Sequence, residues 1–594
     1  MQLRPARLVG IREFLRLFVS ISTSYVRWRL AFSLSVAVAL SLFASTGPLL
    51  LKWIVDALSK VPERGTGLLL SFAGAYVFVQ WSGRALAAAQ GYIQAQADRR
   101  LYRALSDQLF DHVIRLPLRY HLGRRTGAVS EILSNGLLGF QMVQQTLLMS
   151  IVPILIQLAM VSIVLITLHQ EQILLLFLLA VVAYGAVFSQ SASRTRKSAR
   201  DVAAAQIDAR ALMTDSILNY ETVKYFAAES IIRERLDKAL MQSERDWLKF
   251  HFSRSWSSVL VATVFAGFLG ATMFVAVREV VGGRMTVGTF VLVNAYLLQL
   301  VAPIEMIGAA TQTLSQGFAF LEKLVELFGE RAESPSSAVV PCLRGPGKLT
   351  FVNVSGGYAA TEPTLKHISF VLPAGRTLGI VGASGAGKST LVRLLTRLLE
   401  PDEGHILIDD VSIHESELAS VRGAIAVVPQ DTVLFNETIA YNIAFGRPGA
   451  TRAEIEDAAR LAELHDFIVK LPLGYETLVG ERGVRLSGGE KQRVSIARAA
   501  LKNPCIYVFD EATSSLDSRT EKEILRNLTR LAAKTTTVII AHRLSTVIHA
   551  DMILVLDQGV IVEAGLHESL VEKNGHYASL WLAQQADAEP RTAA

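Results

Sequence analysis

The residues best suited to chemistry form a glycine-rich loop after a short apolar run. Thr377–Val381 is typical of a buried strand, and Gly382–Thr390 follows it with the sequence Gly-Ala-Ser-Gly-Ala-Gly-Lys-Ser-Thr. Gly-x4-Gly-Lys-Ser between a strand and an apolar helix is the pattern of a phosphate-binding loop. Its glycines let backbone N–H groups approach phosphates, Lys388 reaches the β- and γ-phosphates, and Ser389 can bind Mg²⁺. We therefore expect ATP-type chemistry with Mg²⁺ here.

Two adjacent carboxylates follow a second predicted strand, about 120 residues farther along the chain. The apolar run Cys505–Phe509 ends in Asp510 and Glu511. After a phosphate loop, such a pair suits one carboxylate that holds Mg²⁺ through water and one that orients the attacking water. We assign the first role to Asp510 and the second to Glu511.

The elements before about residue 325 are much more apolar than those that carry these motifs. Over all 594 residues, 51% are hydrophobic and 19% are charged, against about 25% charged in an average soluble chain. This composition excludes a disordered protein and disfavours an ordinary cytosolic enzyme. The two cysteines, Cys342 and Cys505, exclude a disulfide framework.

Six apolar runs are candidates for membrane spans, since a bilayer core of about 30 Å requires about 20 helical residues. The fourth is the shortest, and a buried soluble helix is its alternative. The six runs are Leu30–Leu51, Gly67–Tyr92, Leu147–Leu168, Ile173–Gln190, Ser258–Val277 and Val287–Gly308.

The segments between spans predict the topology. Those between spans two and three and between spans four and five are long, basic and amphipathic, so we expect helices that extend the spans into water. The positive-inside rule places these segments and both termini in the cytoplasm. The net charge of +6 is explained in the same way, and we expect no nucleic-acid partner. We predict an integral membrane protein of six spans, in a bacterial inner membrane.

Composition also suggests the domain boundaries. We expect an interfacial helix at the membrane surface over residues 1–29, a six-span domain over 30–330, and a polar Pro/Gly-rich linker over 331–348. Short β-rich runs alternate with helical patterns over 349–584, as in an α/β P-loop domain. Residues 585–594 form a small, polar tail that we expect to be flexible.

Between the two nucleotide motifs lies Arg485-Leu-Ser-Gly-Gly-Glu-Lys-Gln-Arg493. Leu-Ser-Gly-Gly-Glu resembles the signature of the ATP-binding cassette (ABC) family. The resemblance implies a type IV exporter fold and ATP hydrolysis. It also implies that Ser487, Gly488 and Gly489 contact the γ-phosphate held by a second cassette.

The resemblance assigns the remaining cassette residues. Tyr358 resembles the aromatic residue that stacks on adenine, and Gln430 the sensor of γ-phosphate and Mg²⁺. Asp517 resembles the residue that couples the two sites across the dimer, and His542 the switch histidine. In this interpretation Glu511, His542 and Gln430 are catalytic, and Mg²⁺ is bound by Ser389, Gln430 and, through water, Asp510. ATP is held by Tyr358, Gly382, Ser384, Gly385, Gly387, Lys388, Ser389, Thr390 and Asp510.

One cassette and six spans are half of the family's usual set. We therefore expect a half-transporter that pairs with a second chain, by default a homodimer, in contact with membrane lipid. Asn219–Phe226 resembles a segment of mitochondrial and bacterial exporters that handle glutathione derivatives, heavy metals and precursors of iron–sulfur assembly. We expect elements that couple the cassettes to the spans near Gly123–Gly127 and Ser216–Phe226.

The sixth span departs from that subfamily. Its run Pro303–Ala309 has Glu305 where an Asn is expected, and it is more similar to a microcin-type lasso-peptide exporter. At about 100° per residue, Asn294, Glu305, Gln312 and Gln316 share one helix face. That face could line a cavity or form interhelical hydrogen bonds, and Glu305 could instead pair with a cation at the interface. The candidate cavity residues are Asn294, Gln299, Glu305, Gln312 and Gln316.

Three functions remain open: export of a small peptide or glutathione-like solute, dedicated export of a lasso or antimicrobial peptide that gives self-immunity, and lipid or multidrug export. A leader-cleaving peptide transporter is not expected, since no cysteine precedes Cys342. A soluble cassette ATPase would need no spans. A nucleotide-gated channel often loses catalytic residues, which Glu511 and His542 argue against.

Overall fold

The computed structural model describes residues 11–59, 66–123, 126–333, 345–358, 363–480, 483, 485–511, 535–541 and 543–588. The chain divides into two compact units. One comprises Met1–Ile114 with Thr126–Glu330, and the other comprises Arg115–Arg125 with Arg331–Ala594.

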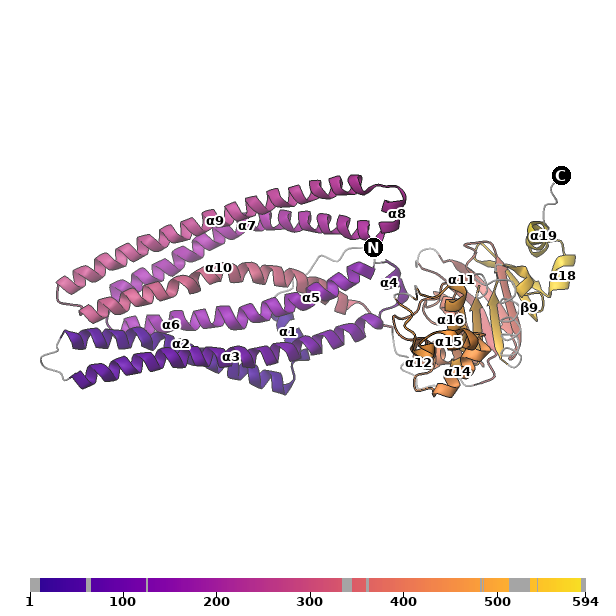
Figure 1. Cartoon of the computed structure of the whole chain (residues 1–594), viewed down its shortest axis with the longest axis horizontal. Helices are drawn as coiled ribbons and strands as arrows, with labels where there is room; N and C mark the ends of the chain where they lie inside the picture. The colour runs from indigo at the N-terminus through magenta and orange to yellow at the C-terminus, as the bar shows by residue number, and fades with distance from the viewer. Residues whose placement is uncertain are drawn as a thin grey trace. The chain divides into compact units, whose positions relative to one another are not determined.

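The first unit is helical throughout its described part (Figure 1). Helices α2 and α3 pack along each other, as do α5 with α10 and α7 with α9. Its elements are α1 (Ile11–Ile21), α2 (Ser24–Leu58), α3 (Thr66–Ile114), α5 (Thr126–Gln145), the π-helical turn η1 (Thr146–Ile151), α6 (Val152–Thr167), α7 (Glu171–Leu218), α8 (Tyr220–Tyr225), α9 (Glu229–Val281) and α10 (Val287–Gly329).

Several of these helices are much longer than a bilayer requires. The 49 residues of α3 and the 53 residues of α9 correspond to about 75–80 Å at about 1.5 Å per residue. The hydrocarbon core accounts for only about 30 Å of that length. Long helical extensions beyond the apolar segments are therefore confirmed.

Every expected span falls inside helical structure: the first in α2, the second in α3, the third across η1 and α6, and the others in α7, α9 and α10. By length and composition, three described helical stretches could cross a membrane: Ser24–Leu58, Glu131–Thr167 and Glu229–Val281. Shorter apolar helical stretches occur at Glu171–Val187 and Val287–Gln299. The number of six spans stays a prediction.

The ends of the expected domains differ slightly from the observed elements. The chain turns between Ile21 and Ser24, so residues 24–29 begin the long helix α2 and do not belong to α1. At the other end, α19 continues through Ala588, past the expected boundary at 584. Residues 334–344 of the expected linker lie outside the described ranges, and β1 begins at Leu349 as expected.

The second unit is an α/β domain built on two sheets. One has the strand order β2-β1-β4-β5 and is antiparallel; the other has the order β10-β9-β3-β8-β7-β6 and is parallel except for the pair β9–β10. The strands are β1 (Leu349–Gly356), β2 (Leu365–Leu372), β3 (Thr377–Gly382), β4 (Glu403–Ile408), β5 (Val411–Ser412), β6 (Ile425–Val428), β7 (Ile506–Asp510), β8 (Thr536–Ile540), β9 (Met552–Asp557) and β10 (Val560–Gly565).

Helices surround these sheets, and a continuous apolar core joins β1, β2, β3, β7 and β8 to the first helix of the domain. The helical elements are α11 (Lys388–Leu395), α12 (Leu418–Ala424), α13 (Ile439–Ala444), α14 (Arg452–Leu461), α15 (His465–Lys470), η2 (Gly474–Glu476), α16 (Gly488–Lys502), η4 (Leu544–Thr546), α18 (His567–Glu572) and α19 (His576–Ala588).

A short helix from the N-terminal half belongs to this second unit. Helix α4 (Leu118–Gly123) packs Leu118 against the apolar core of the domain. The guanidinium of Arg119 donates to the carbonyl oxygen of Gly357, at 2.7 Å from Nη2 and 3.2 Å from Nε, and to Asp402 at 3.2 Å. The short helix between α3 and α5 is thus held against the α/β domain by an apolar contact and by hydrogen bonds.

Within the first unit, α5 and α10 approach closely where both have glycine. A Cβ atom on Gly139 would lie 2.8 Å from the carbonyl oxygen of Gly317 and 2.6 Å from Cβ of Phe320. Such contacts are shorter than atoms tolerate, so the close packing of these helices requires glycine here.

We expect Gly139→Ala to lower the melting temperature of the purified protein, because the added methyl forces the helices apart at a cost of about 1–3 kcal/mol. Gly270→Ala is the matched control on α9, since a Cβ there meets nothing within 4 Å. Thermal unfolding followed by fluorescence measures both, and equal melting temperatures for the two variants would contradict the packing argument.

Candidate functional site

The glycine-rich loop connects β3 to α11 at the carboxyl edge of the six-stranded sheet. Gly382, Gly385 and Gly387 have φ angles of +152°, +84° and +102°, which L-residues with side chains rarely adopt. A Cβ on Gly382 would lie 2.1 Å from the carbonyl oxygen of Leu556. The spacing of the three glycines in the sequence therefore follows from the backbone conformation of the loop. The loop exposes its backbone near the start of α11.

Lys388 begins α11 and folds back over the loop. Its Nζ donates to the carbonyl oxygens of Gly382 at 2.8 Å and Ala383 at 3.0 Å. The residue is only 6% exposed, and burial lowers the pKa of its ammonium, an effect that the carboxylates of Glu511 and Asp510 oppose. An ammonium so placed can exchange two carbonyl contacts for phosphate oxygens.

Tyr358 follows β1 and lies beside α11, although about 30 residues separate them in sequence. Its hydroxyl accepts hydrogen bonds from Arg393 and from the hydroxyl of Thr390, the latter at 3.4 Å. The Arg393 guanidinium lies 5.2 Å from the ring centroid. With 39% of its surface exposed, Tyr358 keeps a ring face available for stacking next to the phosphate loop.

The two carboxylates end β7, which lies two strands from β3 in the same sheet. Burial raises the pKa of Asp510, and the negative charge of neighbouring Glu511 raises it further, while Lys388 opposes both effects. The carboxylates of Asp510 and Glu511 and the ammonium of Lys388 thus lie together at the carboxyl edge of the six-stranded sheet.

Backbone and side-chain contacts both position Glu511. Its φ angle is +52°, a strained value for a residue with a side chain. Its N–H donates to the carbonyl oxygen of Ile540 at 3.1 Å, and its own carbonyl accepts from Gln492 Nε2 at 3.3 Å. Gln430 Nε2 donates to its Oε2 at 2.6 Å. Gln430 and Glu511, both expected at the site, therefore lie in direct contact.

The described residues fit a bound Mg²⁺ ion. Asp510 Oδ1 is buried and has no hydrogen-bond partner in the described part of the chain, while Asp510 also interacts with the Ser389 hydroxyl. Oxygen atoms of Ser389, Asp510 and Gln430 are the ligands that Mg²⁺ prefers. No group of three or more His, Cys, Asp or Glu residues that could hold a metal occurs among the described residues, so the ion would also need phosphate oxygens.

The signature segment starts a separate helix. Ser487 caps α16 in a capping box: its Oγ accepts from the Glu490 N–H at 3.3 Å, and a Glu490 carboxylate oxygen accepts from the Ser487 N–H at 2.7 Å. Ser487 and Gly488 are exposed and Gly489 is half-buried. The positive end of a 15-residue helix therefore remains open to an anion.

Several expected residues fall outside what the structure describes. Asp517 and His542 lie in undescribed segments, and the side chains of Glu305 and Gln312 are not described. Of the other candidate cavity residues, Asn294 is half-buried and Gln316 is exposed on α10. Gln299 donates to the carbonyl oxygen of Ala44 on α2 at 3.3 Å, which is the interhelical hydrogen bond considered as the alternative for this stripe.

Sequence reasoning missed Gln492, which positions Glu511, and Arg119, which holds the backbone beside Tyr358. Gln492 is 1% exposed between Val494, Ser495 and other buried residues of α16. A polar residue on an otherwise apolar helix face is the signal that could have marked it. Arg119 has no comparable signal, because its partner Gly357 is 238 residues away.

Comparisons with known proteins agree with this geometry. Residues 365–514 match the model of the family described as "ABC transporter", and residues 30–304 match "ABC transporter transmembrane region". The chain is 40% identical to the "ATM1-type heavy metal exporter" of Novosphingobium aromaticivorans over 87% of this chain and 85% of that protein. It is 36% identical to the mitochondrial "Iron-sulfur clusters transporter atm1" of Aspergillus fumigatus, over 94% of this chain and 78% of the relative.

A solved structure titled "Structure of a bacterial Atm1-family ABC exporter with ATP bound" aligns with a TM-score of 0.85 and 37% identity, covering 96% of this chain and all of that one. The expected type IV exporter fold, ATP with Mg²⁺ and ATP hydrolysis are thereby confirmed. The chain belongs to the ATP-binding cassette transporters, as an Atm1-type half-transporter that is embedded in the membrane and hydrolyses ATP.

Proposed function

We propose that this exporter moves a glutathione-like or conjugated solute, or a small peptide, out of the cytoplasm across a bacterial inner membrane. Its helices would cross that membrane six times, with both termini cytoplasmic. The similarity over most of the chain to proteins named for heavy metals and iron–sulfur clusters is the observation that carries the substrate class. Thiol-containing peptides suit such cargo, since thiolate is the ligand that soft metals select.

The working unit in this proposal is a homodimer. The helix that begins after Ser487 lies in the same cassette as the phosphate loop, and its N-terminus is exposed. A second copy would place Ser487, Gly488 and Gly489 against the γ-phosphate held at Lys388. ATP would then join two cassettes, and its hydrolysis would release them.

At each site, Lys388 would stabilise the β- and γ-phosphates, and Glu511 would orient the attacking water. Mg²⁺, held by Ser389, Asp510 and Gln430, would neutralise phosphate charge. The contacts from Gln430 and Ile540 fix Glu511 before the nucleotide arrives, so its carboxylate needs little reorganisation.

We expect Glu511→Gln to retain ATP binding and to reduce ATP turnover by about 100-fold or more, the usual contribution of a general base. The amide keeps the shape of the side chain but cannot accept a proton from water. Lys388→Ala should instead lose ATP binding, the step that precedes hydrolysis. Phosphate release and binding of a fluorescent ATP analogue separate these effects.

Glu403→Gln, an exposed carboxylate on β4, is the control and should behave as wild type. Turnover of Glu511→Gln within two-fold of wild type would show that another residue activates the water.

Two six-residue helices lie near the coupling elements expected from the sequence: α4 ends at Gly123, where the first expected element begins, and α8 lies inside the second. We propose that α4 transmits cassette closure through Arg119, whose partner Gly357 adjoins the adenine-side residue Tyr358. Helix α8 would act similarly with its exposed aromatic residues Tyr220 and Tyr225.

We expect Arg119→Ala to keep basal ATP hydrolysis within about two-fold of wild type while lowering transport into inverted vesicles several-fold, because closure is no longer transmitted through this contact. Arg460→Ala is the matched control, since it breaks an exposed ion pair with Asp457 on α14. Equal transport by both variants would argue against coupling through α4.

Variants of the candidate cavity residues can test which solute is transported. Carboxylates are costly in a membrane, so we propose that Glu305, with Asn294 and Gln312, contacts the solute. Glu305→Gln should alter the ATPase stimulation by oxidised glutathione and leave basal ATPase and melting temperature near wild type. A lower melting temperature with unchanged stimulation would make Glu305 an ion-pairing residue instead.

Stimulation of the wild type by a lasso peptide but not by oxidised glutathione would favour the dedicated peptide exporter. The sixth-span run around Glu305, with its similarity to microcin exporters, is the feature that motivates this second candidate.

A further inference from the structure

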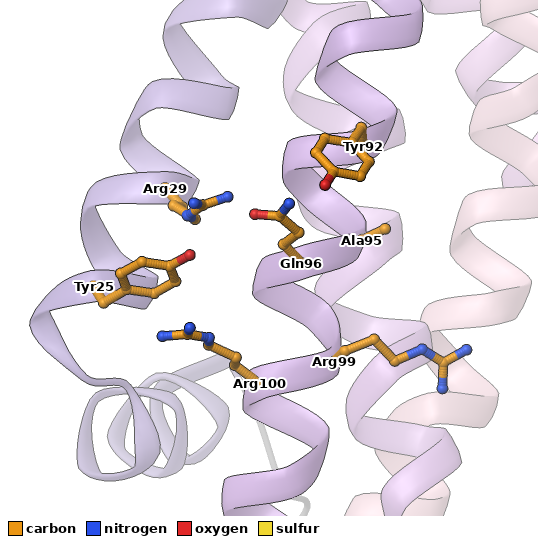
Figure 2. Close-up of a pocket in the computed structure, with 7 residues that line it drawn as sticks. All are labelled: Tyr25, Arg29, Tyr92, Ala95, Gln96, Arg99 and Arg100. Atoms are coloured by element: carbon orange, nitrogen blue, oxygen red, sulfur yellow. The ribbon is translucent and has the colours of Figure 1, made fainter.

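A pocket of about 600 Å³ lies between the N-terminal end of α2 and the middle of α3, away from the nucleotide residues (Figure 2). It belongs entirely to the helical unit. Its polar lining residues are Tyr25, Arg29, Tyr92, Gln96, Arg99 and Arg100. Neither ATP hydrolysis nor the candidate cavity on α10 explains this cluster of basic side chains.

Two of the arginines converge on one aromatic ring. The guanidinium carbons of Arg29 and Arg100 lie 4.5 Å and 3.7 Å from the centroid of the Tyr25 ring, and Figure 2 shows them on either side of it. Stacking fixes both groups, but it also brings two positive charges close together. An anion bound close to both guanidinium groups would offset that repulsion.

No carboxylate within the described residues forms an ion pair with Arg29, Arg99 or Arg100. Asp98, the nearest acid in sequence, is instead surrounded by amides. It accepts from Gln94 at 2.9 Å, Gln144 at 2.5 Å and Gln145 at 3.2 Å. The positive charge of the pocket is therefore available to a ligand.

Neutral donors complete the pocket. In Figure 2 the amide of Gln96 lies between the hydroxyl of Tyr92 and the Arg29 side chain. A guanidinium pair with hydroxyl and amide donors suits a phosphate, whose oxygens accept several hydrogen bonds at once.

The position of the pocket relative to the apolar runs of α2 and α3 indicates which kind of molecule carries that phosphate. The apolar run of α2 starts at Leu30, next to Arg29, and the apolar run of α3 ends at Tyr92, about 12 Å before Arg100. Trp28 and Tyr92 are 77% and 68% exposed, as is common for aromatic residues at a membrane interface. With these runs in the bilayer, as the proposed six-span topology has them, the pocket lies at the level of lipid headgroups.

Helix α1 supports this placement. Phe14 is buried and packs against Phe140 at 5.3 Å, while Ile11, Leu15 and Val19 are exposed along the helix. An apolar outer face with nearby arginines is typical of a helix that lies in the interface.

We propose that the Tyr25–Arg29–Arg100 pocket binds the phosphodiester of an anionic phospholipid at this end of the helix bundle. A soluble phosphorylated compound has the same chemistry, but it would not need a pocket that begins where the apolar surface ends. The lipid would brace α2 against α3 and so stabilise the bundle.

The test measures lipid binding to the purified full-length transporter by native mass spectrometry, with phosphatidylglycerol and phosphatidylcholine as probes. Wild type should bind phosphatidylglycerol about tenfold or more tightly than phosphatidylcholine, since each basic residue near the surface contributes about 1 kcal/mol. Arg29→Gln/Arg100→Gln should lose most of this preference. Tyr25→Leu, which keeps both charges but removes the ring, should lose part of it.

Arg16→Gln/Arg103→Gln removes the same charge from exposed positions on α1 and α3 that do not line the pocket, and should stay within two-fold of wild type. Basal ATPase in phosphatidylcholine nanodiscs verifies that every variant is folded. Equal losses in the two double variants, or no preference in wild type, would overturn the proposal. Stabilisation of wild type by inorganic phosphate without any preference for phosphatidylglycerol would also overturn it, in favour of a soluble ligand.

Discussion

Burial and the repulsion between two neighbouring carboxylates shape the electrostatics of the nucleotide site. Asp510 and Glu511 are consecutive residues at the end of β7, and burial together with the charge of Glu511 raises the pKa of Asp510. The ammonium of Lys388, itself buried, is the cation that opposes this effect most strongly. The charges of the two carboxylates and the ammonium group are balanced only when Mg²⁺ and phosphates bind. Nucleotide binding and the stability of the site are therefore linked.

The fold brings these charged groups close together. Parallel strands β3 and β7, separated by β8, bring the phosphate loop and the acids to one edge of the sheet. Glu511 then takes a left-handed backbone conformation, which bonds to Ile540 of β8 and Gln492 of α16 hold in place. Since Ser487 caps α16 and Gln492 lies in its second turn, the helix that carries the signature segment also holds the backbone of Glu511.

The sequence predicted the parts of this site that depend on short spacings. Gly382–Lys388 is recognisable because three glycines must adopt positive φ angles and one lysine must start α11. Glycine spacing says nothing, by contrast, about Gln492, whose contact with Glu511 depends on how α16 packs on β7. The break between Ile21 and Ser24 was missed for a similar reason: the surrounding residues are amphipathic or apolar on both sides, so hydropathy shows no boundary.

Long-range contacts bring a segment from the N-terminal half of the sequence into the cassette, and sequence spacing cannot reveal them. Arg119 belongs in sequence to the segment between two long helices, yet its guanidinium bonds to Gly357, the residue before Tyr358. One side chain thus joins α4 to the backbone next to Tyr358. Leu118 beside it is partly buried and packs against the cassette core, so a displacement of α4 would disturb contacts of that core.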